Sequence, residues 1–416
     1  MSIRNTGIIN FDLLYATLIV IALTTFFFFE GGATSSFIKL GVMGIAPIIF
    51  FLRGVIITEA LIIGIGYWLW CYFSSLLIGE QRFSTLGFTG MYIITFIVFY
   101  NYLRNDVFTF SYFKQLLRII IMAFGVVLIC QQICMLVGLR IMPIVNLNNQ
   151  AFLSLTKLPI LTLEPSHSAR IMAALALCYW RMYQMEYGER LKLKNLFKGE
   201  MKQPMILFFW SMLTMGSGTA FIALGILSLY FITKETYFYV MPFLVAMYMI
   251  SGTMELTQFE RARRLADASL TGDTEMIQEA DGSGASRIIP VINTITKTDL
   301  SNTDTWVGKG TAKIDSLWWI KTDRKIGVID QYGLIGFIIS MLLVYRCMIR
   351  RFISIESLFF LGLLGMSIGN IYYAWGCLTL FAGVRYFQEQ KEQGILIVIE
   401  ENERVDTEFE ITKNIE

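Results

Sequence analysis

L-L-Y-A-T-L-I-V-I-A-L-T-T-F-F-F-F, residues 13–29, is an apolar run that contains no charged side chain. A helix of about 20 apolar residues crosses the hydrocarbon core of a bilayer, so this stretch approaches spanning length. It is too long for the apolar region of a secretory signal, and Glu30, Gly31 and Gly32 follow it instead of a small-residue cleavage site. We therefore expect it to stay in the chain as the first membrane span.

Apolar runs of this kind recur along the chain, and charged residues are scarce. Of the 416 residues, 55% are hydrophobic and 16% are charged, whereas soluble domains carry roughly 25% charge. We predict an all-α integral membrane protein with about 12 transmembrane helices, because that many apolar runs reach or approach spanning length. They lie at residues 12–29, 37–53, 55–78, 86–103, 116–139, 169–185, 204–216, 219–233, 237–254, 328–346, 353–369 and 371–386.

The pair of runs at 204–216 and 219–233 has a second interpretation. Each run is short, and Gly216, Ser217 and Gly218 interrupt what could be one longer helix. The pair could instead form a broken or re-entrant segment, which membranes tolerate where protein surrounds it.

Lysine and arginine residues between the runs predict the orientation, because short cytoplasmic loops carry their excess. They cluster at 104–118, 190–202 and 346–351, and an even number of spans places all three clusters on the side of both termini. We therefore expect cytoplasmic N- and C-termini. The predicted organisation is transmembrane helices 1–9 over residues 1–254, including a periplasmic segment at 140–168, then a large periplasmic loop over 255–327, helices 10–12 over 328–387 and a cytoplasmic tail over 388–416.

Several function classes lack their usual sequence signals. The formal charge is +2, and a nucleic-acid site needs clustered basic residues on one face, so no nucleic-acid partner is expected. No G-x-x-x-x-G-K-[ST] loop, H-E-x-x-H motif or Cys/His metal spacing occurs. The six cysteines fall in apolar runs, where thiols act as small hydrophobes. We expect no cofactor, no metal and no disulfide framework.

The first candidate site is L-T-L-E-P-S-H-S-A-R, residues 161–170. It brings Glu164, Ser166, His167 and Arg170 to the approach of a membrane helix, and His167 is the only histidine of the chain. Ionisable groups at a membrane edge are expensive and commonly functional. At i and i+3, His167 and Arg170 would share one helical face. The alternative is an ordinary helix start, in which Pro165 occupies the first turn.

Two further candidates lie later in the chain. Arginines gather in the large loop, and planar guanidinium groups match phosphate oxygens well; they are Arg261, Arg263, Arg264 and Arg287. For the first three, a basic helix resting on anionic headgroups explains them equally well. L-T-M-G-S-G-T-A, residues 213–220, places Ser217 and Thr219 in a membrane run, where small residues also allow close helix packing.

Taken in order, these motifs resemble the O-antigen polymerase (Wzy-type) group, which belongs to the O-antigen ligase-polymerase superfamily. E-P-S-H resembles the E-P-S element of that group, L-T-M-G-S-G-T-A-F-I-A its following helix, and Arg287 the arginine of its large periplasmic loop. W-V-G-K-G at 306–310, with Gly308 and Gly310, and Q-Y-G-L-I-G-F at 331–337 resemble its glycine pair and return helix. The group often has an aromatic residue after E-P-S, where this chain has His167.

The resemblance implies a GT-C-like architecture and a metal-independent, inverting glycosyltransferase of the bacterial inner membrane. The implied substrate is an undecaprenyl-pyrophosphate-linked oligosaccharide, polymerised at the periplasmic face into O-antigen, capsular or exopolysaccharide, with the lipid bilayer and a chain-length regulator protein as further partners. Arg170 and Arg287 would face the pyrophosphate, and either Glu164 or His167 would act as the base. The implied substrate-binding residues are Ser166, Arg261, Arg263, Arg264, Ser217, Thr219, Gly308 and Gly310.

Two other functions compete with this interpretation. O-antigen ligases typically carry a functional histidine in the large loop, and residues 255–327 contain none. A lipid-linked oligosaccharide flippase or other transporter is expected to place ionisable residues near the membrane midplane, often in two related halves. Here the ionisable residues gather at one predicted edge, which favours the polymerase.

Overall fold

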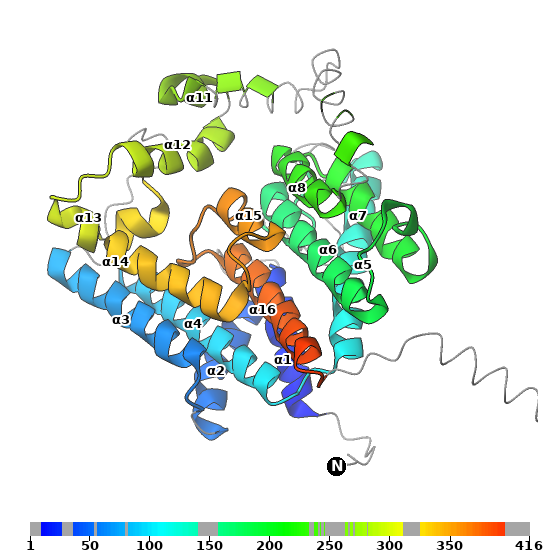
Figure 1. The fold of residues 1–416 in the computed structure, drawn as a ribbon, viewed down its shortest axis with the longest axis horizontal. Coiled ribbons are helices and arrows are strands. Elements are labelled where there is room, and N and C mark those ends of the chain that lie inside the picture. Colours follow the sequence, from blue (N-terminus) through cyan, green and yellow to red (C-terminus); the bar gives the residue numbers. More distant parts are fainter. Residues whose placement is uncertain are drawn as a thin grey trace, which may run out of the picture.

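The computed structural model describes residues 10–26, 36–53, 56–79, 82–139, 157–232, 237–239, 242, 245, 263–264, 267–268, 271–280, 282–310 and 325–395. Across these residues the regular structure is helical, without strands, as Figure 1 shows. The all-helical class predicted from the apolar runs is therefore confirmed.

The helices follow the predicted runs in order. Their bounds are α1 Phe11–Thr24, α2 Phe37–Leu52, α3 Glu59–Ile78, α4 Phe83–Arg104, α5 Phe110–Leu136, α6 Pro165–Tyr187, α7 Lys202–Thr214, α8 Gly218–Ser228, α11 Thr274–Ala280, α12 Gly282–Thr296, α13 Thr303–Val307, α14 Gly327–Leu343, α15 Ile355–Gly362 and α16 Tyr372–Glu392. A π-helical turn, Val344–Met348, continues α14. The predicted span at 237–254 lies mostly outside the described residues.

Four helices of the described chain are long and apolar enough to cross a membrane: α3, α4, α5 and α14 with its π-helical turn. Shorter apolar helices are α1, α2 and α8 with the turn that follows it. The chain therefore has the helices of a membrane protein. The larger number of spans and the large loop stay predictions.

The predicted span at 353–369 differs from the structure. Residues 353–369 are not one helix, because α15 has 8 residues and would cover only about 12 Å at 1.5 Å per residue. The helix ends at Gly362, and the turn that follows has positive φ angles at Gly365 and Met366, which a right-handed helix does not adopt. At the interrupted pair of runs, Gly216, at φ 77°, separates α7 from α8, so two short helices lie where two runs were predicted.

Helices α6 and α16 form the centre of the bundle (Figure 1). The α6 residues from Ser168 to Trp180 are all buried, and most of α16 is buried as well. Gly376 lets α16 approach α1, because a Cβ there would lie 2.4 Å from the Leu23 carbonyl oxygen. These central helices carry polar and charged residues that the surrounding helices shield, which explains why neither is among the most apolar segments.

The three predicted basic clusters lie at one end of the bundle, here called the basic end. Lys114 at the start of α5 pairs with Glu186 at the end of α6, and Arg346 of the π-helical turn pairs with Glu59 at the start of α3. Lys391 at the end of α16 donates a hydrogen bond to the Met185 carbonyl of α6. Because the clusters share one end, the predicted common side of these loops fits the fold.

The other end of the bundle, here called the site end, holds the starts of α6, α14 and α16. The Phe26 amide, just after α1, donates to the Leu161 carbonyl just before α6. Figure 1 shows α11, α12 and α13 beyond this end of the helices. The Ile326 amide before α14 donates to Thr294 Oγ1 of α12 at 3.0 Å.

Candidate functional site

The first turn of α6 exposes a carboxylate at the site end. Glu164 occupies the N-cap position with extended backbone, and Pro165 follows at the first helical position. The Glu164 side chain makes no cap hydrogen bond and is 58% exposed. Its Oε2 accepts a hydrogen bond from Ser166 Oγ at 3.3 Å and lies 3.9 Å from Nε2 of His167. The carboxylate is therefore directed towards its neighbours in the motif and not towards the helix amides.

His167 is held between two tyrosines from the start of α16. Its Nδ1 lies 3.1 Å from the Tyr372 hydroxyl, and its ring centroid lies 4.4 Å from that of Tyr373. The Tyr372 hydroxyl accepts a hydrogen bond from the Leu163 amide at 3.3 Å. These contacts fix the imidazole orientation with one ring nitrogen on Tyr372 and the other facing Glu164.

Arg170 lies one helical turn deeper on the same face. It is 4% exposed, its Nε donates to the Leu363 carbonyl at 2.8 Å, and its guanidinium carbon lies 4.6 Å from the Tyr373 ring centroid. The structure thus brings Glu164, His167 and Arg170 together. It buries the arginine behind the histidine, whereas the sequence interpretation placed it at the membrane surface.

Lys39 is a member of this cluster that the sequence interpretation missed. It lies in the first turn of α2, is 4% exposed, and its Nζ has no hydrogen-bond partner in the described part of the chain. The ammonium lies 3.8 Å from the ring centroid of Tyr372 and 4.6 Å from that of Phe26. Burying an unpaired charge is costly, and cation–π contacts offset only part of that cost. A lysine inside an apolar run was the signal that could have identified it.

The glycine pair packs against the start of α14. Lys309 N donates to Asp330 O at 2.8 Å, and Gly310 N donates to Gln331 O at 3.1 Å. At Gly308 a Cβ would lie 2.4 Å from that same Gln331 oxygen, so only a glycine allows this close approach. The glycine pair and the return helix, which the resemblance treats as two motifs, are therefore in contact.

The turn at residues 363–371 connects these motifs to the α6 cluster. Its first residue, Leu363, accepts the hydrogen bond from Arg170. Further along, Ser367 Oγ lies next to Gly327 at the start of α14, and Gly369 approaches Gln331 Oε1. The α6 cluster and the glycine pair consequently lie at the same end of the bundle.

The break between α7 and α8 also lies at the site end. The Leu158 amide, shortly before the α6 cluster, donates to Met215 O at 3.2 Å. Ser217 and Thr219 are both buried beside this break, and α8 packs against α6. These two hydroxyl residues therefore lie near the cluster, within the packed helices.

The structure describes only some of the candidate arginines of the predicted large loop. Arg261 and the side chain of Arg287 lie outside the described residues. Arg263 and Arg264 are exposed, and Arg263 Nε lies 3.8 Å from an Asp267 carboxylate oxygen. Within the described part of the chain, His, Cys, Asp and Glu side chains form no cluster of three or more that could hold a metal.

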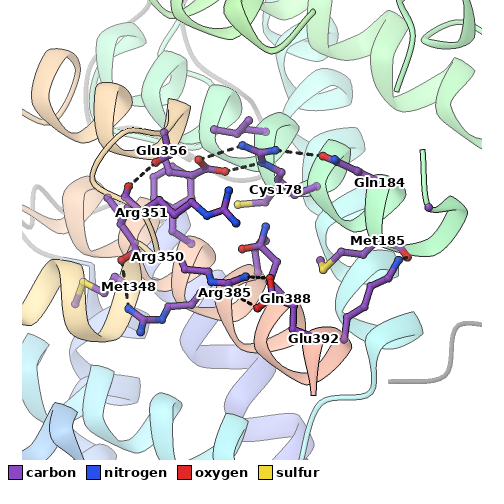
Figure 2. A pocket seen from close by; sticks show the side chains of 18 residues that line it. Cys178, Gln184, Met185, Met348, Arg350, Arg351, Glu356, Arg385, Gln388 and Glu392 are labelled. Atoms are coloured by element: carbon purple, nitrogen blue, oxygen red, sulfur yellow. Dashed lines mark hydrogen bonds and ion pairs between the residues drawn. The ribbon is translucent and has the colours of Figure 1, made fainter. Parts of the chain in front are cut away.

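A cavity of about 480 Å³ lies at the basic end, between α6, α16 and the start of α15 (Figure 2). Its floor includes Leu177, Cys178 and Phe381, and its walls are rich in arginine. The cavity occupies the end of α6 opposite to Glu164 and His167. It is therefore a separate feature from the predicted site.

No protein-family model, curated protein or solved structure matches the chain.

Proposed function

We propose that this chain polymerises oligosaccharide repeat units carried on a lipid pyrophosphate, by inverting glycosyl transfer at the site end. The observation that carries the proposal is the cluster of two buried basic side chains, Lys39 and Arg170, beside the Glu164–His167 pair. The order of motifs that resembles the O-antigen polymerase group supports it. The contacts between residues 306–310 and 330–333 at the same end support it further.

The two cations suit a pyrophosphate leaving group. In the proposed step, the acceptor hydroxyl oxygen bonds to the anomeric carbon as the carbon–oxygen bond to pyrophosphate breaks, and the electron pair leaves with the pyrophosphate. Positive charge fixed in a site of low polarity stabilises the negative charge that develops on the departing oxygen. Lys39 has no hydrogen-bonding partner of its own among the described residues, so it can bind a pyrophosphate oxygen without first losing an interaction.

The contacts of His167 favour Glu164 as the base. The Tyr372 hydroxyl oxygen accepts a hydrogen bond from the Leu163 amide, so the hydroxyl can donate its own hydrogen bond to Nδ1 of His167. The imidazole then carries its proton on Nε2, which faces the Glu164 carboxylate at 3.9 Å. Glu164 is also far more exposed than His167, 58% against 17%, and is the group that an incoming acceptor sugar reaches first. In this arrangement His167 orients the carboxylate that takes the proton.

A flippase is the second candidate, because polar groups occupy both ends of α6 and α16. The Glu164 cluster lies at one end of these helices and the arginine-rich cavity at the other. This arrangement offers polar contacts to a transported headgroup on both sides of the bundle. Covalent chemistry would not then be required of Glu164.

The first experiment uses purified protein in nanodiscs with a lipid-pyrophosphate-linked repeat unit and EDTA, and measures product length. We expect a ladder of longer glycans from the wild type. Glu164→Gln should remove the ladder, because it keeps shape and removes the basic oxygen. Glu189→Gln is the matched control, since Glu189 is exposed beyond the other end of α6.

The alternative functions give different results with the same purified protein. If a verified substrate yields no elongation while a fluorescent lipid-linked oligosaccharide crosses the bilayer of liposomes, the chain is a flippase. Equal ladders from Glu164→Gln and the control would show that Glu164 is not the base.

A further inference from the structure

The cavity at the basic end has more positive than negative charge. Its lining cations are Arg181, Arg350, Arg351, Arg385 and Lys391, and its lining carboxylates are Glu356 and Glu392. Arg181, Arg350, Arg385 and Lys391 are partly buried at the cavity wall, whereas Arg351 is exposed at its mouth. An excess of cations in such a place calls for an anion.

Both carboxylates of the cavity are already paired. Glu356 accepts hydrogen bonds from Nε and Nη2 of Arg181, at 2.7 and 3.3 Å. Glu392 accepts two from Arg350, and this interaction holds the pKa of the Glu392 carboxyl below its ordinary value. Each carboxylate is therefore already hydrogen-bonded to one arginine of the lining. Figure 2 shows these pairs around the cavity.

The remaining cations have unused donors. Arg385 pairs with Glu389, which is outside the lining, and its Nη1 donates to two carbonyl groups. Lys391 donates to the Met185 carbonyl and has no carboxylate within ion-pair distance in the described chain. Arg351 has no ion-pair partner among the described residues. Arg351 and Lys391 thus line one cavity without a direct ion pair among the described residues.

Neighbouring side chains add neutral donors to this wall. Gln184 uses its Oε1 to accept from Arg181, which leaves its amide nitrogen as a donor. Gln388 lies one turn before Lys391 on α16 and also lines the cavity. Guanidinium, ammonium and amide donors converging on one space are the groups that hold phosphate oxygens.

We propose that this cavity is a binding site for a phosphate-bearing anion at the basic end of the bundle. Its ligand is either the phosphate headgroup of an anionic lipid or a soluble pyrophosphate-type anion. Basic cavities between membrane helices suit the former, and its volume of about 480 Å³ accommodates either. The proposal does not depend on the polymerase function.

The test measures binding to the full-length protein in phosphatidylcholine nanodiscs. Calorimetry with inorganic pyrophosphate tests the soluble source, and native mass spectrometry after doping with phosphatidic acid tests the lipid source. The cavity variant is Arg351→Gln with Lys391→Gln. Its matched control is Lys194→Gln with Lys198→Gln, which removes the same charge from exposed positions near the same end.

We expect at least one probe to bind the wild type. The cavity variant should raise the dissociation constant of that probe by about tenfold or more, and the control should change it by less than about twofold. A Lys39→Met variant must leave this binding unchanged, which separates it from any pyrophosphate held at the site end. Equal thermal midpoints of the unliganded variants show that folding is intact. The proposal is overturned if neither probe binds, or if the cavity variant and the control weaken binding equally.

Discussion

Replacing Lys39 by methionine should both raise the free energy of unfolding and slow glycan elongation. Methionine has a similar length and an unbranched, apolar chain, so it fills the space between Phe26 and Tyr372 without the charge. The substitution loses cation–π attraction of about 2 kcal/mol or less. It also removes an unpaired buried ammonium whose desolvation costs several kcal/mol. The expected balance is a stabilisation of about 1–3 kcal/mol, seen as a thermal midpoint roughly 1–5 °C higher.

The same substitution should slow elongation by about a hundredfold or more, the effect of removing one preorganised charge or donor from a transition state. Thermal unfolding in detergent measures the first effect, and product length in nanodiscs measures the second, on protein from the same purification. Lys194→Met, an exposed lysine at the basic end, should change neither. A lower midpoint for Lys39→Met together with an unchanged glycan ladder would refute the reasoning, because Lys39 would then be a structural residue.

Three further outcomes are expected. Arg287→Ala should abolish long-chain product at an unchanged protein level in the membrane, read on a glycan gel beside an immunoblot. Arg263→Ala should shorten the glycans only mildly if this exposed side chain contacts headgroups, and as severely as Arg287→Ala if it binds pyrophosphate. Gly333→Ala should destabilise the protein by at least about 2 kcal/mol, because φ is +72° and a Cβ would lie 2.1 Å from the Trp306 carbonyl oxygen. Gly327→Ala, where a Cβ would meet only a side-chain oxygen at 3.7 Å, is its control in the same unfolding assay.

The helices could be predicted from the sequence wherever lipid or apolar neighbours surround them. Hydropathy alone was enough for α3, α4, α5 and α14, because their apolar runs extend for a full span. It was insufficient at residues 353–369, where the run is equally apolar but the chain turns after α15. A turn packed among other helices keeps its apolar composition, so only the positive φ at Gly365 and Met366 distinguishes it from a span.

Only part of the candidate site could be predicted from the sequence. Glu164, His167 and Arg170 could be grouped because helical spacing places them on one face. Lys39 and Tyr372 join them from other helices, and no local pattern links positions so far apart in the chain. For Gly308 the sequence suggested a substrate-binding role. In the structure this glycine packs against the backbone of α14.

The central helices also bear on the choice between polymerase and flippase. Arg170 and Leu177 mark the inner limits of the cluster and of the cavity on α6, and about 10 Å of helix separates them at 1.5 Å per residue. That stretch is fully buried and otherwise apolar, and Trp375 of α16 is buried as well. A flippase would have to open this packed layer for a sugar to pass, whereas glycosyl transfer at the site end leaves it closed. The packing of α6 and α16 therefore favours a catalyst that works from one end.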